Sequence, residues 1–163
     1  MDTLAAQVGT ALKAHGLMLT TAESCTGGGV ASALTDIRGS SIWFERGFVT
    51  YSNDAKCDML GVAQETLLRH GAVSEVVVRE MVAGALQHSK SGIALAVSGV
   101  AGPDGGSAEK PVGTVWFAWG IKSGACEARL HRLPGSRTEV REQAVRIALQ
   151  GVLEMLSQRS EIA

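Results

Sequence analysis

This sequence has few aromatic residues and no large excess of charge of either sign. Only 4% of the 163 residues are aromatic, with a single tyrosine, and the formal net charge is −1. A protein that binds single-stranded nucleic acid offers aromatic side chains for stacking, and one that binds a duplex offers a basic surface for its phosphates. We therefore expect no nucleic-acid partner.

Cysteine is also sparse. Cys25, Cys57 and Cys126 are odd in number and widely spaced, and no CxxC pattern is present. This spacing predicts neither a zinc site nor a disulfide framework. The four histidines show no metal-ligand spacing either, so we expect no metal ion and no cofactor.

Long apolar runs are missing as well. No stretch approaches the roughly 20 apolar residues that cross a bilayer, and the N-terminus lacks the pattern of a secretory signal. We expect a cytoplasmic protein with no membrane partner. What is present is a 45% hydrophobic and 19% charged chain, which suits a single packed domain over residues 1–163.

The hydrophobic pattern predicts a mixture of helices and strands. Helical spacing of apolar residues, with capping and stop signals, predicts helices over 3–15, 53–61, 75–89 and 137–157, and a further one after the glycines at 27–29. Apolar and β-branched runs predict strands over 17–22, 42–52 and 93–99, and a hairpin from 112–121 and 126–133. Gly47 is a candidate bulge. Helices and strands mix without strict alternation, which favours a three-layer α/β/α sandwich with a mixed sheet.

The first candidate site segment is AESCTGGG (22–29), between a predicted strand and a predicted helix. Glycine-rich turns that enter a helix present backbone N–H groups to an anion or an oxyanion. Ser24, Cys25 and Thr26 place three candidate nucleophiles in this turn. Alternatively, Ser24 or Thr26 caps the helix and the glycines only form a tight turn.

The second segment is TYSNDAK (50–56), which contains Tyr51, Asn53 and Lys56. A lysine near a serine acts as a base when burial lowers its pKa, because desolvation disfavours the ammonium. Serine–lysine pairs are a known variant of the catalytic triad. The alternative is a solvated lysine at the start of a helix.

The third segment, SGVAGPDGGS (98–107), is rich in glycine and proline, which lets the backbone approach a ligand closely. Ser98 and Asp104 are candidates to contact ribose hydroxyls, with Gly102 between them. A flexible surface loop explains the same composition.

Two weaker signals point to a phosphate. Arg137 and Arg141 lie near a predicted helix start, where cations oppose the helix dipole, so we consider one of them a phosphate ligand. Solvated arginines paired with Glu139 or Glu142 are an equally good interpretation. Ser41, in the segment GSS (39–41), is a further candidate phosphate contact.

Taken together, AESCTGG, FERGFVTYSNDAK, SGVAGPDGGS and EKPVGTVWFAW resemble the signatures of the CinA C-terminal-domain family, and the resemblance runs from about residue 3 to residue 155. Stand-alone members of that family are nicotinamide-nucleotide amidohydrolases with an α/β/α fold. The resemblance implies a small nucleotide substrate, nicotinamide mononucleotide, and amide hydrolysis without a metal.

The resemblance also implies Ser24 as nucleophile, Lys56 as general base and Tyr51 as a supporting residue. Substrate contacts are implied for Thr26, Gly27, Ser41, Ser98 and the last arginines, and we add Gly28, Asn53, Gly102 and Asp104 from the loops above.

The chain departs from the family pattern at PGSR (134–137), where Ser136 stands in place of an acidic residue. Any role of that acid is therefore in doubt here. The alternative function is a non-catalytic nucleotide-binding or interaction module. We expect a homodimer or a higher homo-oligomer, the usual state of small enzymes.

Overall fold

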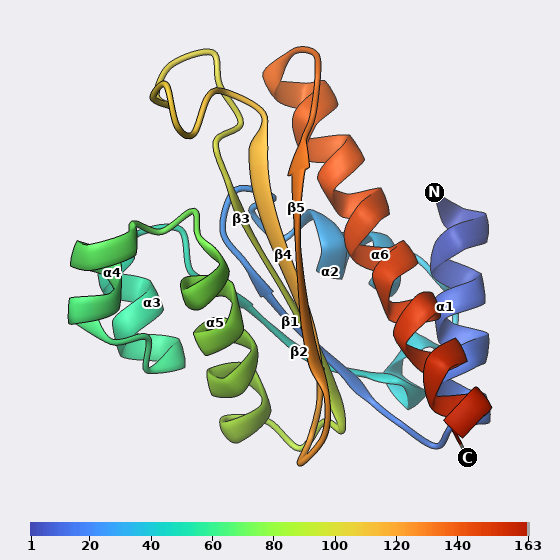
Figure 1. The fold of residues 1–163 in the computed structure, drawn as a ribbon. Coiled ribbons are helices and arrows are strands. Elements are labelled where there is room, and N and C mark those ends of the chain that lie inside the picture. The colour runs from blue at the N-terminus through green and yellow to red at the C-terminus, as the bar shows by residue number, and fades with distance from the viewer. Residues whose placement is uncertain (163) are drawn as a thin grey trace.

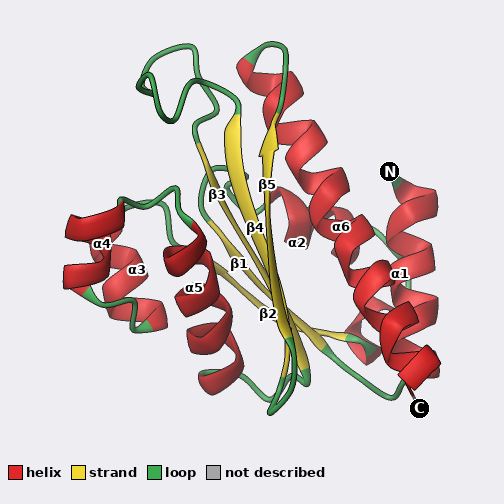
Figure 2. Ribbon diagram, viewed as in Figure 1, coloured by secondary structure: helices red, strands yellow, loops and turns green. Residues whose placement is uncertain are grey.

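The computed structural model describes residues 1–162 and contains one five-stranded sheet between two layers of helices (Figures 1 and 2). The strand order is β2-β1-β3-β4-β5. Strands β1, β2 and β3 are parallel, whereas β4 is antiparallel to both β3 and β5. The strand bounds are β1 Leu19–Glu23, β2 Phe44–Val49, β3 Ile93–Gly99, β4 Thr114–Ile121 and β5 Cys126–Arg132. The predicted mixed sheet is confirmed.

Helices cover both faces of this sheet, which confirms the three-layer sandwich (Figure 1). One face carries α3 Asn53–Leu60, α4 Gln64–His70 and α5 Glu75–Gln87. The other face carries α1 Asp2–Ala14, α2 Gly29–Thr35 and α6 Arg137–Ile162. Within the described residues, no helix has the length and apolar character needed to span a membrane.

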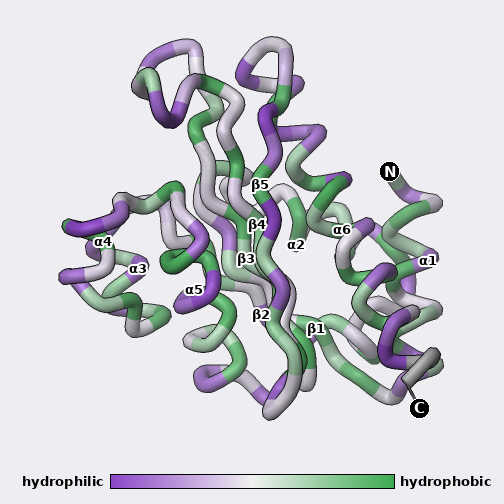
Figure 3. The backbone as a smooth tube through the Cα atoms, viewed as in Figure 1, coloured by the Kyte–Doolittle hydropathy of each residue, from purple (hydrophilic) through white to green (hydrophobic). Residues whose placement is uncertain are grey.

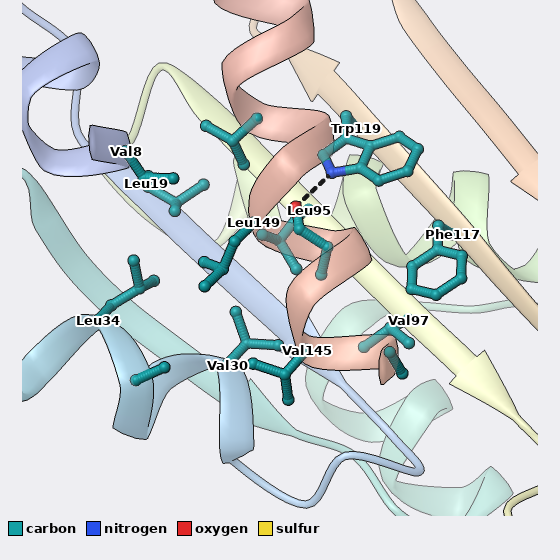
Figure 4. Close-up of a cluster of buried hydrophobic side chains, with 14 of the residues drawn as sticks. Val8, Leu19, Val30, Leu34, Leu95, Val97, Phe117, Trp119, Val145 and Leu149 are labelled. Atoms are coloured by element: carbon teal, nitrogen blue, oxygen red, sulfur yellow. Dashed lines mark hydrogen bonds between the residues drawn. The ribbon is translucent and has the colours of Figure 1, made fainter. Parts of the chain in front are cut away.

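Each face of the sheet has its own apolar cluster because side chains alternate along the strands. On β3, Leu95 and Val97 point toward α1 and α6, whereas Ala96 points toward α5. Figure 4 shows the first cluster, where the Trp119 indole N–H donates a 2.8 Å hydrogen bond to the Ala148 carbonyl of α6. In the tube of Figure 3, helices α1, α5 and α6 alternate between hydrophobic and hydrophilic residues, as expected for helices with one buried side.

Several boundaries differ from the predicted ones. The strand expected over 42–52 is shorter, because residues Ser40–Ile42 form a 3-10 turn and Ser52 caps α3. The predicted bulge at Gly47 is wrong: Leu19 pairs with Phe44 and Thr20 with Arg46, so the irregularity falls at residue 45. At Gly47 the close neighbour is Thr21, whose Oγ1 would lie 2.6 Å from an added Cβ. Helix α4 was not predicted, and α6 extends past residue 157.

The topology creates a switch point at the carboxyl ends of β1 and β3. The chain leaves β1 toward β2 on one side and returns to β3 on the other, so the connections diverge between β1 and β3. Open α/β sheets bind ligands at such a switch point, beyond the carboxyl ends of the strands. The three segments singled out in the sequence follow β1, β2 and β3, and because these strands are parallel the segments lie along this edge.

Candidate active site

A cavity of about 270 Å³ opens at the switch point. Six of the predicted site residues line this cavity, namely Ser24, Tyr51, Asn53, Lys56, Ser98 and Arg137. The remaining lining is Cys25, Gly99 and Ala101, together with Ala72 and Val73 from the segment between α4 and α5. Sequence reasoning missed Ala72 and Val73, since two small apolar residues before a helix carry no chemical signal.

Ser24 and Lys56 lie in direct contact in this cavity. Ser24 is the first residue after β1, and its N–H donates to the Val97 carbonyl of β3 at 3.0 Å. It follows Ala22 in the strand alternation, so its side chain lies on the sheet face that α3 and α5 cover. The Lys56 Nζ atom lies 3.1 Å from Ser24 Oγ.

The position of Lys56 is fixed by the start and the packing of α3. The Ser52 hydroxyl caps the helix by accepting the Ala55 N–H at 3.0 Å. Gly84 of α5 lets α3 come close, because an added Cβ at that position would lie 1.9 Å from the Leu60 carbonyl oxygen. The lysine side chain is thereby enclosed and is only 1% exposed.

The surroundings of Lys56 disfavour its charged form. Burial lowers the pKa of Lys56 below its ordinary value of 10.5, because the ammonium loses its hydration. Within the described chain the hydrogen bonds of its Nζ all involve oxygens of neutral groups: Ser24 Oγ, the Thr50 carbonyl at 3.0 Å and the Tyr51 carbonyl at 3.3 Å. A neutral amine has two hydrogens for the two carbonyls, which leaves its lone pair for the Ser24 hydroxyl proton. The pair therefore suits a serine nucleophile with a lysine base.

Glu23 anchors the turn that follows Ser24, a role that sequence reasoning missed. Its fully buried carboxylate accepts the Thr26 hydroxyl at 2.6 Å and the N–H groups of Val30 and Ala31 at 2.9 and 3.0 Å. Glu23 thus satisfies the start of α2 in place of Ser24 or Thr26, so the capping alternative is wrong for both. The only signal in the sequence was an acidic residue directly before the turn.

Cys25 lies beside Ser24 but has a different environment. Its side chain is 6% exposed and belongs to the apolar cluster on the α6 face of the sheet. Burial raises the pKa of the Cys25 thiol to about 11. A thiol is a nucleophile only as the thiolate, so the chemistry favours Ser24 over Cys25.

Both predicted arginines reach the switch-point edge from the start of α6. Arg137 donates to the Gly102 carbonyl at 2.7 Å and to the Tyr51 hydroxyl at 3.3 Å. Arg141 donates to the carbonyls of Cys25 and Thr26 at 3.0 and 3.3 Å. Among the described side chains, neither arginine forms the alternative ion pair with Glu139 or Glu142. Glu139 instead accepts the Ser136 N–H at 2.9 Å.

The other predicted contacts lie around or outside the cavity. Gly27 and Gly28 adopt positive φ angles of 57° and 96°, which favour glycine, and the Gly27 N–H donates to the Ser24 carbonyl. Gly102 is buried, and Asp104 is exposed in the loop after β3. Ser41 is exposed near the opposite end of β2, so the structure does not bring it to the cavity within one chain. Among the described residues, no three His, Cys, Asp or Glu side chains form a metal-binding group.

Comparison with known proteins gives consistent matches along nearly the whole chain. Residues 1–156 match the family model described as CinA C-terminal domain. The chain is 57% identical to nicotinamide-nucleotide amidohydrolase PncC of Escherichia coli strain K12, over 96% of this chain and 95% of that protein. It is 52% identical to the PncC protein of Pseudomonas putida, over 95% and 96%. A crystal structure of a CinA superfamily protein from Klebsiella pneumoniae superposes with a TM-score of 0.93 at 44% identity, over 96% of this chain and 98% of that one.

Proposed function

This chain belongs to the CinA C-terminal domain family, and from that premise we propose that it hydrolyses nicotinamide mononucleotide to nicotinic acid mononucleotide and ammonia. The relatives named as nicotinamide-nucleotide amidohydrolases support the substrate class. The observation that carries the mechanism is the buried contact of 3.1 Å between Ser24 Oγ and Lys56 Nζ.

In the first step, neutral Lys56 accepts the Ser24 hydroxyl proton while Oγ attacks the carboxamide carbon on the pyridine ring. The carbonyl oxygen becomes an oxyanion, which free backbone N–H groups of the turn after Ser24 stabilise. Lys56, now an ammonium, returns the proton to the amide nitrogen, the C–N bond breaks, and ammonia leaves. The product of this half-reaction is an ester between Ser24 and the nicotinate group.

In the second step, Lys56 accepts a proton from water, and the hydroxide equivalent attacks the ester carbon. The C–O bond to Ser24 breaks, and Lys56 returns the proton to Oγ, so the enzyme is restored and the acid is released. Each half-reaction uses the lysine once as a base and once as an acid. A lysine whose pKa is lowered by burial suits both tasks.

The remaining lining of the cavity supports a nucleotide substrate. Ala72 and Val73 give an apolar wall that suits a flat pyridine ring, and Ser98 contributes a buried hydroxyl. Arg137 is the exposed cation of the lining, and its free guanidinium N–H groups suit the substrate phosphate.

The test is ammonia release from nicotinamide mononucleotide, measured with and without EDTA. We expect wild type to be active under both conditions and Ser24→Ala to lose activity by at least about 1,000-fold. The matched control is Cys25→Ala, which changes the next side chain and should retain most of the activity. A folded wild-type protein that releases no ammonia would refute the substrate assignment. Full activity in Ser24→Ala with loss in Cys25→Ala would move the nucleophile to the thiol.

A further inference from the structure

Arg141 contacts the turn after Ser24 through two backbone carbonyls. It belongs to α6, which packs against α2, and its side chain is half-buried. Its Nε donates to the Cys25 carbonyl at 3.0 Å and its Nη2 to the Thr26 carbonyl at 3.3 Å. Gly27 leaves room for this contact, since an added Cβ would lie 3.3 Å from Arg141 Nη2. The guanidinium is therefore engaged with two consecutive peptide groups.

Those two contacts fix the direction of the neighbouring N–H groups. In a trans peptide the C=O and the following N–H point in opposite directions. With the Cys25 carbonyl directed at Arg141, the Thr26 N–H is directed away from it. The Gly27 N–H is already used by the Ser24 carbonyl, whereas the Thr26 N–H has no acceptor among the described residues. The Thr26 N–H is thus a free donor two residues after the nucleophile.

Thr26 is held at a second point by Glu23. The Thr26 hydroxyl donates to the buried Glu23 carboxylate at 2.6 Å, and the same carboxylate accepts two N–H groups at the start of α2. The residue is therefore fixed through its side chain on one side and through its carbonyl, by Arg141, on the other. Donors fixed before the substrate arrives stabilise an oxyanion without a cost of reorganisation.

We propose that Arg141 is a positioning residue that orients the Thr26 N–H as an oxyanion donor, and that it is not the phosphate ligand. This inference rests on the proposed amide hydrolysis. The cation also polarises the peptide group that it binds, which strengthens the donor at its other end. Arg137, one helical turn earlier, lines the cavity and keeps the phosphate role.

The experiment compares Arg141→Met and Arg141→Lys with Arg146→Met, which alters an exposed arginine on the same helix. Kinetics are measured with nicotinamide mononucleotide and with the nucleoside that lacks its phosphate. We expect Arg141→Met to lower kcat about 100-fold, the usual loss for one oxyanion donor, with KM changed less than about threefold. The loss should be equal for both substrates, and Arg141→Lys, which retains a charged donor group, should lose less. Added guanidinium ion should restore part of the activity of Arg141→Ala.

Two results would overturn the inference. One is a raised KM for the nucleotide alone with kcat retained, which would make Arg141 a phosphate ligand. The other is behaviour of both Arg141 variants equal to that of Arg146→Met. If Arg141→Met does not fold, Arg141→Lys keeps the charge and the aliphatic stem and carries the same comparison.

A second readout separates this inference from the substrate assignment. An alkyl fluorophosphonate reacts with an activated serine and develops negative charge on its phosphoryl oxygen, so it needs the same donor. We expect Arg141→Met to slow phosphonylation of Ser24 by at least tenfold relative to Arg146→Met, as followed by mass spectrometry. If wild type reacts with this probe but not with nicotinamide mononucleotide, the proposed substrate fails while the role of Arg141 is still decided. Equal phosphonylation rates would contradict the role of Arg141.

Discussion

Replacing Lys56 with methionine separates the role of this amine in catalysis from its cost to folding. Methionine has a similar length and volume and no charge, so it fills the same buried position in the lining of the cavity. The variant should lose ammonia release, because Ser24 no longer has a base. Its stability should change in a way that depends on pH.

The magnitude follows from the proton that Lys56 gives up on folding. In the unfolded chain the lysine holds its proton up to about pH 10.5, whereas burial lowers its pKa in the folded protein. Folding with a neutral lysine therefore costs about 1.4 kcal/mol for each pH unit by which burial lowers this pKa. Methionine removes this cost but leaves the Thr50 and Tyr51 carbonyls without their donor, at about 1 kcal/mol each. We expect Lys56→Met to gain most stability relative to wild type at the lowest pH of the range, where the cost of neutralising the lysine is largest.

The sign of the pH dependence is fixed by linkage. Between the folded pKa and 10.5 the unfolded state binds more protons, so wild-type stability rises with pH in this window. Within this window the stability of Lys56→Met relative to wild type should fall by about 1.4 kcal/mol per pH unit.

Urea denaturation of both proteins at half-unit steps from pH 7.5 to 10 measures this difference. The matched control is Lys13→Met on the exposed side of α1, for which the difference should stay flat. A flat difference for Lys56→Met across the same range would show that the buried lysine stays charged. That result would refute the assignment of Lys56 as a neutral base.

Three further outcomes follow from the same contacts. The rate of ammonia release should rise with pH through the lowered pKa of Lys56, because only the neutral amine accepts the serine proton, and a pH–rate profile measures it. Glu23→Gln should lower the unfolding free energy by about 2 kcal/mol, because an amide cannot accept all three hydrogen bonds. The control is the exposed Glu65→Gln, which should change the unfolding free energy by less than about 0.5 kcal/mol, and urea titrations measure both variants. Gly84→Ala should lower the unfolding free energy by at least about 2 kcal/mol and reduce activity, because the added Cβ pushes α3 away at the Leu60 carbonyl. Calorimetry measures the stability, and an ammonia assay measures the activity.

Periodicity was enough to predict the layers and most elements of this fold. The apolar run 93–99 is the central strand Ile93–Gly99, residue for residue, because a strand buried on both faces is apolar throughout. Helix α4 was missed because seven residues are too few for a clear period. The bulge falls at residue 45 and not at Gly47 because register depends on the partner strand, which local sequence does not encode.

The candidate site shows the same division between local and tertiary information. Sequence and family resemblance predicted that Ser24 and Lys56 act together, and the structure brings their polar atoms to 3.1 Å. The contacts of Glu23 and Arg141 could not be predicted, because the first reaches seven residues ahead and the second more than a hundred residues back. Both depend on how α2 and α6 pack beside the end of β1.

The most direct test of the central claim is the identity of the residue that carries the acyl group during turnover. Wild type is mixed with nicotinamide mononucleotide, quenched in acid within one turnover and digested, and the peptides are sequenced by mass spectrometry. The account predicts a substrate-derived ester on Ser24 that is absent from Ser24→Ala and still forms in Cys25→Ala. An adduct on Cys25, or turnover in Ser24→Ala, would contradict it.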